Sequence, residues 1–313
     1  MINSDKPQRW RQDIQDSVGL YNEWFLRAAP EAYRNTRSSI VDEVESAFHQ
    51  TSNMSEITPQ VIRASPTILR TLRMSTAPPI ARDRLVGLAY STKTVVYSLE
   101  EGKIPPRVTG LGPHLDRICG VLQELLDLDL FDWIKTGAQP DARQWELAKV
   151  VVGDRLCGAI ADPIVRNAQE QRQLALIAQW LDDRGYVKKA HPSGRILQDM
   201  EPGTYSFRQI VVVGDVQQVN IPIDVVIQPH SPKPSSLPVL IEAKSAGDFT
   251  NTNKRRKEEA TKIRQLQDKY GSDCSLLLFL CGYFDAGYLG YEAAEGLDWV
   301  WEHRIDDLAQ AGL

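Results

Sequence analysis

The segment from Arg208 to Ser245 constrains the fold of this chain most strongly, because it places charged residues inside sequence that is typical of buried strands. Asp224 lies in IPIDVVI, and Glu242 and Lys244 lie in VLIEAK. The β-branched residues on both sides of these charges predict strands that are buried on at least one face. Burial of a charge is costly unless the charge is paired or binds a metal. These three side chains are therefore candidates for a functional site.

The first half of the chain has a different pattern. Residues 1–150 contain apolar residues at helical spacing in several segments, which are separated by breaks that contain proline. The second half, residues 151–313, alternates helical and strand-like patterns. We therefore predict a helical N-terminal region over 1–150 and an α/β domain over 151–313, with the boundary near residue 150.

A helix that ends at Gly185 is predicted to begin with Asp162 as its N-cap and Pro163 in its first turn. Its apolar stripe includes Leu174, Ile177 and Leu181, and it continues backwards to Glu170. This carboxylate either belongs to turns that project beyond the core or contributes to the site, and the pattern supports both interpretations equally.

The strands follow this helix. A hairpin is predicted over 209–227, with Gly214 and Asp215 as its turn, and the strand of Glu242 comes after a proline-rich connection. A basic helix over 254–271 and the strand SLLLFLCGYF follow, and a final helix is predicted over 291–310. This order of elements indicates a mixed β-sheet flanked by helices.

The spacing of the three charged residues carries little information. An acid-x-lysine triplet is expected about once or twice by chance in a chain of this composition. Asp83 precedes Glu101-Gly102-Lys103 by 18 residues, the same spacing as that between Asp224 and Glu242. Context separates the two sets, because the first lies in helical and turn sequence where exposed charges are ordinary. An ordinary buried ion pair between Lys244 and a carboxylate remains the alternative to a catalytic site.

As a catalytic site, this arrangement suits magnesium-dependent cleavage of phosphodiesters. Asp224, Glu242 and the carbonyl of Ala243 could hold one or two Mg²⁺ ions, which prefer oxygen ligands. Lys244 would orient the attacking water and stabilise the charge of the transition state. Glu170 is a candidate for a further acid, if its helix packs beside the sheet.

Length, composition and charge indicate an ordinary globular protein of 313 residues with a net charge of −5. The N-terminus lacks the apolar core of a signal peptide, and no apolar run is long enough to span a membrane, so we expect a cytoplasmic protein without membrane contact. The four cysteines are scattered, with no zinc-like spacing, and are expected to be reduced and buried.

The basic residues are distributed unevenly. Six lie between positions 60 and 98 against one acid, the segment 254–257 reads KRRK, and the last 29 residues carry seven acids. Such polarity suits a protein with one face towards a polyanion, although exposed helix faces explain most charge runs.

The chain also resembles the XamI family of type II restriction endonucleases, a branch of the PD-(D/E)xK nucleases. The resemblance lies in four segments along most of the chain: TPQVIRASPTILRTLRMSTAPPIARDRL, DRLCGAIADPIVRNAQEQRQLALIAQWL, IEAKSAGDFTNTNKRRKEEATKI and GYLGYEAAEGLDWVWEHRIDDL. By position, Asp224, Glu242 and Lys244 match the two acids and the lysine of the family motif. Ile223 stands before the first acid, so the literal Pro-Asp pair is absent.

This resemblance implies a PD-(D/E)xK core that cuts both strands of DNA at a short palindrome, with GTCGAC as the leading candidate, in a host whose methyltransferase protects that site. A palindromic target suggests a homodimer. The expected DNA contacts follow from charge and position, and most would go to phosphates. They are Asn251, Asn253, Lys254, Arg255, Arg256 and Lys257 after the catalytic strand, and Arg70, Arg73, Arg82 and Arg84 in the N-terminal region.

Two other functions are compatible with these features. One is a structure-specific or repair nuclease of the same superfamily, which would nick DNA or degrade ends without a fixed site. The other is a catalytically inactive DNA-binding module, and the intact set of Asp224, Glu242 and Lys244 argues against it.

Overall fold

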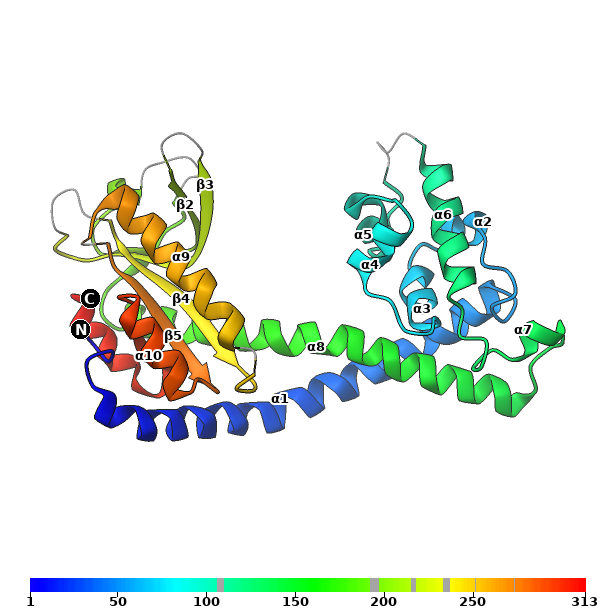
Figure 1. Ribbon diagram of the computed structural model, residues 1–313, viewed down its shortest axis with the longest axis horizontal. Coiled ribbons are helices and arrows are strands. Elements are labelled where there is room, and N and C mark those ends of the chain that lie inside the picture. The colour runs from blue at the N-terminus through cyan, green and yellow to red at the C-terminus, as the bar shows by residue number, and fades with distance from the viewer. Residues whose placement is uncertain (106–109, 192–196, 215–217, 233–236, 251, 273) are drawn as a thin grey trace. The chain divides into compact units, whose positions relative to one another are not determined.

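The computed structural model describes residues 1–105, 110–191, 197–214, 218–232, 237–250, 252–272 and 274–313, and for residues 252–256 it describes the backbone only. The chain forms two compact units (Figure 1). Unit 1 contains Met1–Ala28 and Arg166–Leu313, and unit 2 contains Ala29–Val165.

This division differs from the boundary near residue 150 that the sequence predicted. Helices α1 (Pro7–Gln50) and α8 (Ala142–Asp182) each contribute residues to both units, so no break in the helical pattern marks where one unit ends. Each helix does contain a proline close to the division, Pro30 in α1 and Pro163 in α8. Because proline has no N–H to donate, the helical hydrogen-bond ladder is interrupted at both places.

The start of α8 differs from the predicted one. Asp162 is not an N-cap but lies inside a helix of 41 residues, where its carboxylate accepts a hydrogen bond of 2.5 Å from the hydroxyl of Tyr33. The long helical segments on both sides outweigh the single bond that Pro163 removes. The predicted end is confirmed, because the helix ends at Asp182 and Gly185 has a left-handed φ of +79°.

Unit 2 is helical around its own apolar core, to which Phe48, Leu72 and Leu122 contribute fully buried side chains. The side chains of Thr58 and Thr92 cap two of its short helices by accepting backbone hydrogen bonds. The short helices are α2 (Pro59–Ala64), α3 (Ile68–Met74), α4 (Arg82–Leu88), α5 (Lys93–Glu100), α6 (Leu111–Glu124) and α7 (Trp133–Thr136).

Unit 1 contains a mixed sheet of six strands in sequence order. The hairpin β2–β3 and the pair β3–β4 are antiparallel, whereas β1–β2, β4–β5 and β5–β6 are parallel. The predicted mixed sheet with flanking helices is thereby confirmed. The strands are β1 (Val187–Lys188), β2 (Thr204–Val213), β3 (Val219–Gln228), β4 (Val239–Ala246), β5 (Leu276–Gly282) and β6 (Asp298–Trp301).

Helices cover both faces of this sheet (Figure 1). On one face, Ile177 and Leu181 of α8 pack with side chains of β3, β4 and β5. On the other face, Ile263 and Leu266 of α9 (Thr252–Tyr270) pack with another set of side chains from the same strands. The remaining elements are α10 (Ala286–Ala294) and the 3₁₀ segments η1 (Leu197–Asp199) and η2 (Glu302–Ala311).

The last segment is not the single helix that was predicted over 291–310. It contains α10, β6 and η2, and both Trp299 and Trp301 are fully buried in β6 against α10. In a strand, residues two apart lie on the same face. The neighbouring β5 supplies the partners that turn this short apolar sequence into a strand.

The cysteines and the absence of membrane-spanning segments were also expected from the sequence. All four cysteines are buried and free, as predicted. No helix in the described part of the chain is long and apolar enough to cross a membrane.

Substitution of the two tryptophans tests the strand. In β6 both side chains enter one core, so Trp299→Ala and Trp301→Ala should each lower the free energy of unfolding by about 3–5 kcal/mol. In a helix the two residues would point about 200° apart, and only one substitution would be costly. Urea denaturation measures both, with Leu26→Ala, which is 72% exposed, as a control expected to stay within about 0.5 kcal/mol of the parent. A large loss for only one tryptophan would contradict the strand.

Candidate active site

Three charged residues lie in one row across strands β2, β3 and β4. Arg208 and Asp224 occupy opposite positions in the β2–β3 register, between the pairs Phe207↔Val225 and Gln209↔Ile223. The β3–β4 ladder ends at Val225↔Ile241, and one further step in the same register places Asp224 opposite Glu242. The charged residues therefore begin where the β3–β4 ladder ends.

At this row, the side chains of β2 and β3 switch from one face of the sheet to the other. Before it, Phe207 and Val225 face α8, and after it, Ile223 and Val211 face α9. Arg208 makes this change with a left-handed φ of +52°, a conformation that costs a residue with a Cβ atom about 1–3 kcal/mol. Such strained positions are frequent at active sites. The irregularity explains how Asp224, inside an apolar strand, stays half-buried instead of entering either core.

The backbone of β4 anchors the first carboxylate. The N–H of Ala243 donates a hydrogen bond of 2.9 Å to Oδ2 of Asp224. In an extended strand, the N–H and C=O of one residue point to the same side. The carbonyl of Ala243 is therefore also directed towards Asp224, which makes it available as an oxygen ligand beside the two acids.

The two carboxylates repel each other in a partly buried environment. Burial raises the pKa of Asp224 to about 6, and the charge of Glu242 and a hydrogen bond between the two carboxyl groups act in the same direction. The Ala243 N–H and the ammonium of Lys244 oppose this increase without cancelling it. The pair holds more negative charge than its surroundings stabilise, a condition that a divalent cation would relieve.

This donor set fits Mg²⁺. Two carboxylates and a main-chain carbonyl are hard oxygen ligands, and Mg²⁺ in phosphoryl-transfer sites is usually held by one or two carboxylates together with substrate phosphates. Within the residues that the structure describes, no group of three or more His, Cys, Asp or Glu side chains could hold a metal ion.

Alternation along a strand places Lys244 on the same face of β4 as Glu242, and this face is towards α9. The Nζ atom of Lys244 lies 3.6 Å from Glu242 and 3.5 Å from Glu259 of α9. Lys262, one turn further along α9, forms an ion pair with Glu242. Sequence reasoning missed both α9 residues, although one signal was present: Glu259 lies on the buried stripe of α9 together with Ala260, Ile263 and Leu266.

Glu170 lies on α8 and is not in direct contact with this cluster. Its carboxylate binds the guanidinium of Arg208 at 2.8 Å. Arg208 in turn stands opposite Asp224, so Glu170 is connected to the row through one side chain. The apolar stripe that includes Leu174 is buried as predicted, whereas Glu170 itself is partly exposed.

The residues expected to contact DNA after the catalytic strand are only partly described. Asn251 lies outside the described residues. Asn253, Lys254, Arg255 and Arg256 form the first turns of α9, and their side chains also lie outside the described part. Lys257 is described and exposed. The basic segment is therefore helical, and five residues join its helix to β4.

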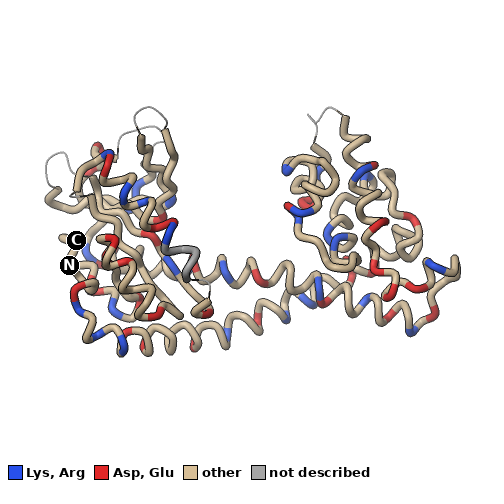
Figure 2. Tube along the Cα trace, in the orientation of Figure 1, with Lys and Arg blue, Asp and Glu red and all other residues tan. Residues whose placement is uncertain are grey.

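The four arginines of the N-terminal region do not form one surface. Arg73 is buried and is bound by Glu100 and by the carbonyl of Ile80, so it has a structural role. Arg70 is engaged by Glu43 at 2.6 Å. Arg82 and Arg84 are exposed, and Figure 2 shows basic positions next to acidic ones in unit 2. A helix turns its residues in all directions, which spacing in the sequence did not reveal.

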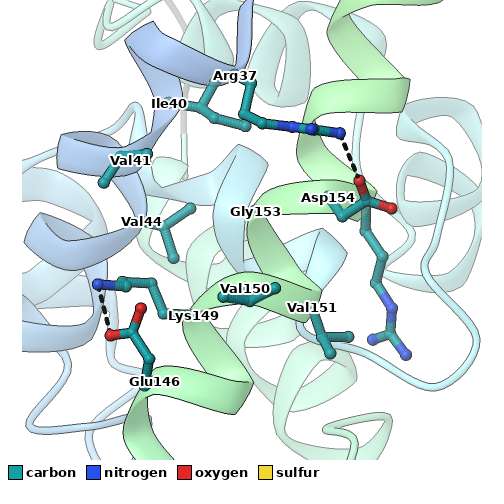
Figure 3. Close-up of a pocket in the computed structure, with 11 residues that line it drawn as sticks. Arg37, Ile40, Val41, Val44, Glu146, Lys149, Val150, Val151, Gly153 and Asp154 are labelled. Atoms are coloured by element: carbon teal, nitrogen blue, oxygen red, sulfur yellow. Dashed lines mark hydrogen bonds and ion pairs between the residues drawn. The ribbon is translucent and has the colours of Figure 1, made fainter. Parts of the chain in front are cut away.

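A cavity in unit 2 is a competing candidate. It has a volume of about 670 Å³ and lies between α1 and α8 (Figure 3). Arg37 points towards Asp154 at 3.2 Å, and Lys149 towards Glu146 at 2.7 Å. Valine side chains form much of the remaining wall. Glu146 and Asp154 lie eight residues apart on α8, about 12 Å along the helix axis, so this cavity lacks the converging carboxylates of a metal site.

The alternative set of Asp83, Glu101 and Lys103 has no such arrangement. The side chains of Lys103 and Glu101 are 71% and 60% exposed and form a surface ion pair of 2.9 Å. Asp83 pairs with Lys93 at 3.5 Å, also on the surface. Identical spacing thus produces a solvated surface in one place and a buried site in the other.

Known proteins that are similar to this chain include restriction enzymes. The family model of the XamI restriction endonucleases matches residues 52–301. The type II restriction enzyme SalI of Streptomyces albus G is 67% identical over 314 residues, covering 100% of both chains. A crystal structure of protein VC1899 from Vibrio cholerae covers 81% of this chain, and the chain spans only 56% of that structure, with 15% identity and a TM-score of 0.29, which is too low to assign a fold.

The raised pKa predicts that Asp224 destabilises the metal-free protein. The ordinary pKa is 3.8 and the folded value is about 6, so the folded state binds this proton more tightly, and the free energy of unfolding falls as pH rises through that window. Asp224→Asn removes the charge and keeps the acceptor for Ala243. We expect it to stabilise the protein by about 1–2 kcal/mol at pH 8 in chelator and to change little at pH 4.

Thermal and urea denaturation at several pH values measure this effect. Asp83→Asn, at an exposed acid, is the matched control and should change stability by no more than about 0.5 kcal/mol. An Asp224→Asn variant with no gain at pH 8, or with the same gain at every pH, would contradict the electrostatic description of the site.

Proposed function

The chain belongs to the XamI restriction endonuclease family, and we propose that it makes Mg²⁺-dependent double-strand breaks in DNA at a short palindromic sequence. Family membership and 67% identity over the full length to a type II restriction enzyme make it a site-specific deoxyribonuclease. The observation that supports the chemistry is the row of Asp224 and Glu242 beside Lys244 at the open end of the β3–β4 ladder. The proposed target is GTCGAC, as the family resemblance implies.

Asp224, Glu242 and the carbonyl of Ala243 would hold one or two Mg²⁺ ions. When bound, the metal supplies Lewis-acid chemistry at the scissile phosphate. Lys244 is a cation that faces the same space and is held by two buried carboxylates. Its ammonium donates hydrogen bonds to the attacking water and to a non-bridging phosphate oxygen, where negative charge accumulates in the transition state.

The reaction adds the oxygen of water to phosphorus and breaks the bond to the 3′ oxygen. The products are a 5′-phosphate and a 3′-hydroxyl, with one proton of the water delivered to the leaving oxygen. Glu170 is proposed as a further acid at the edge of this site, connected to it through Arg208. Because Arg208 is exposed and stands opposite Asp224, the Glu170 carboxylate also fixes where that guanidinium points.

DNA is proposed to reach the site along the start of α9. Lys257 and the preceding segment with Asn251, Asn253, Lys254, Arg255 and Arg256 follow the catalytic strand directly, so they would contact the phosphates near the cleaved bond. Arg82 and Arg84 remain the exposed basic residues proposed for unit 2. A palindromic target cut on both strands implies a homodimer with two equivalent sites. The family resemblance implies a methyltransferase in the same host, and the proposed location is cytoplasmic.

Mapping the cut ends tests the substrate and the metal together. Plasmid DNA with and without GTCGAC sites is incubated with the protein, with Mg²⁺ and with a chelator, and the ends are sequenced. We expect discrete fragments with 5′-phosphates at one palindrome only when Mg²⁺ is present. Cleavage in the chelator, or random nicking of both plasmids, would overturn the proposal.

Removal of the lysine tests the catalytic assignment. Lys244→Ala should reduce the cleavage rate by more than about 100-fold, because a donor aimed at the transition state is lost, while affinity for DNA stays nearly unchanged. Lys103→Ala, in the other Glu-x-Lys triplet, is the control and should cut at the rate of the parent. Single-turnover cleavage and a DNA-binding titration in Ca²⁺ measure the two quantities. A Lys244→Ala variant that cleaves DNA at the rate of the parent would contradict the catalytic role of Lys244.

A further inference from the structure

One buried carboxylate beside the site has no role in the proposed mechanism. Glu259 lies on α9 with only 1% of its surface exposed. Its Oε2 atom accepts a hydrogen bond of 2.6 Å from the hydroxyl of Tyr288 on α10. Its Oε1 atom accepts no hydrogen bond from any residue that the structure describes, and it lies 3.5 Å from Nζ of Lys244.

An ionised carboxylate at this depth needs a cation nearby. Lys244 supplies it, and the same ammonium lies 3.6 Å from Glu242. Lys244 is thus placed between a carboxylate of its own strand and a carboxylate of α9. Since a lysine side chain has four rotatable bonds, two anions on different elements define its position far better than one.

We propose that Glu259 is a positioning residue for Lys244 in the cleavage reaction. Glu259 holds the ammonium of Lys244 beside Glu242. The hydroxyl of Tyr288 binds Oε2 of Glu259 and so keeps Oε1 directed at that ammonium. The inference rests on the proposed function, in which Lys244 contacts the phosphate. It gives Glu259 of α9 and Tyr288 of α10 a role in holding the side chain of Lys244 in place.

A role in folding alone does not account for this arrangement. Well-packed apolar residues often replace a buried ion pair without loss of stability, so stability alone does not explain why a carboxylate is buried beside Lys244. The link between α9 and β4 is already made by the ion pair of Lys262 with Glu242 and by the apolar contacts of Ile263. What Glu259 adds is a fixed negative charge directed at Lys244.

The first test changes the charge and keeps the shape. Glu259→Gln retains an acceptor for Tyr288 but removes the negative charge next to Lys244. We expect the single-turnover rate at saturating cognate DNA to fall by about 10–100-fold, as is typical when the partner of a functional group is lost, while KM changes less than about threefold. Glu258→Gln, at the exposed neighbouring position on α9, is the control and should leave both quantities unchanged.

Conservative variants separate positioning from folding. Glu259→Asp keeps the charge but withdraws it by one methylene, so its rate should lie between those of the parent and Glu259→Gln. In a Lys244→Ala background, Glu259→Gln should cause no further loss, because the group that it positions is absent. Additive losses in the double variant would show that Glu259 acts independently of Lys244 and would overturn the proposal.

A last measurement needs no cleavage. Amine-specific labelling of the DNA-free protein, read by mass spectrometry, reports how firmly each lysine is held. Glu259→Gln should increase the labelling rate of Lys244 several-fold relative to Lys103, which serves as the internal reference. Equal labelling in parent and variant, or a folded Glu259→Gln variant that cleaves normally, would reject the positioning role while leaving the nuclease assignment intact. Failure of the parent to cut DNA would instead reject the proposed function.

Discussion

The repulsion between Asp224 and Glu242 is the constraint on which the rest of the site depends. Burial, together with the neighbouring charge of Glu242, raises the pKa of Asp224 to about 6, so the charge of Asp224 is unfavourable in the metal-free site at neutral pH. The protein keeps the pair together by rigid means. The sheet register sets the two residues opposite each other, and the Ala243 N–H fixes one carboxylate. Lysines from β4 and α9 supply partial compensation.

A switch of side chains from one sheet face to the other, in the β2–β3 hairpin, makes the position of Asp224 possible. A regular strand has only two faces, and both faces of β3 are covered by helices in unit 1. At the row of Arg208 and Asp224 the strands exchange faces, and the residues at the exchange point enter neither core. The left-handed backbone of Arg208 is the local cost of the exchange, and its side chain connects the row to Glu170 of α8.

Helix α9 links the basic segment to the site. Its N-terminal turns contain the KRRK sequence, and its middle contains Glu259 and Lys262, which contact the two charged residues of β4. A single rigid helix thus joins the segment proposed to meet DNA phosphates to the residues that surround the proposed metal ligands.

The sequence by itself determined several features of the site. β-Branched residues around Asp224 and Glu242 predicted buried strands, and the period of two placed Glu242 and Lys244 on one face, where both contact α9. The exposed set around Lys103 shows that spacing alone could not have done this, since the same interval there lies on the surface. The resemblance to the family, rather than any residue count, pointed to a restriction enzyme.

Only the tertiary structure decided which distant residues meet. The register of β3 on β4 put Asp224 opposite Glu242, the crossing of α9 brought Glu259 to Lys244, and the neighbouring β5 made a strand of the segment with Trp301. Burial of Arg73 against Glu100 likewise arises from packing of helices that are far apart in sequence. The sequence pattern of one helix or strand predicts which of its side chains share a face. Contacts between elements depend on strand register, helix crossing and burial, which are properties of the whole fold.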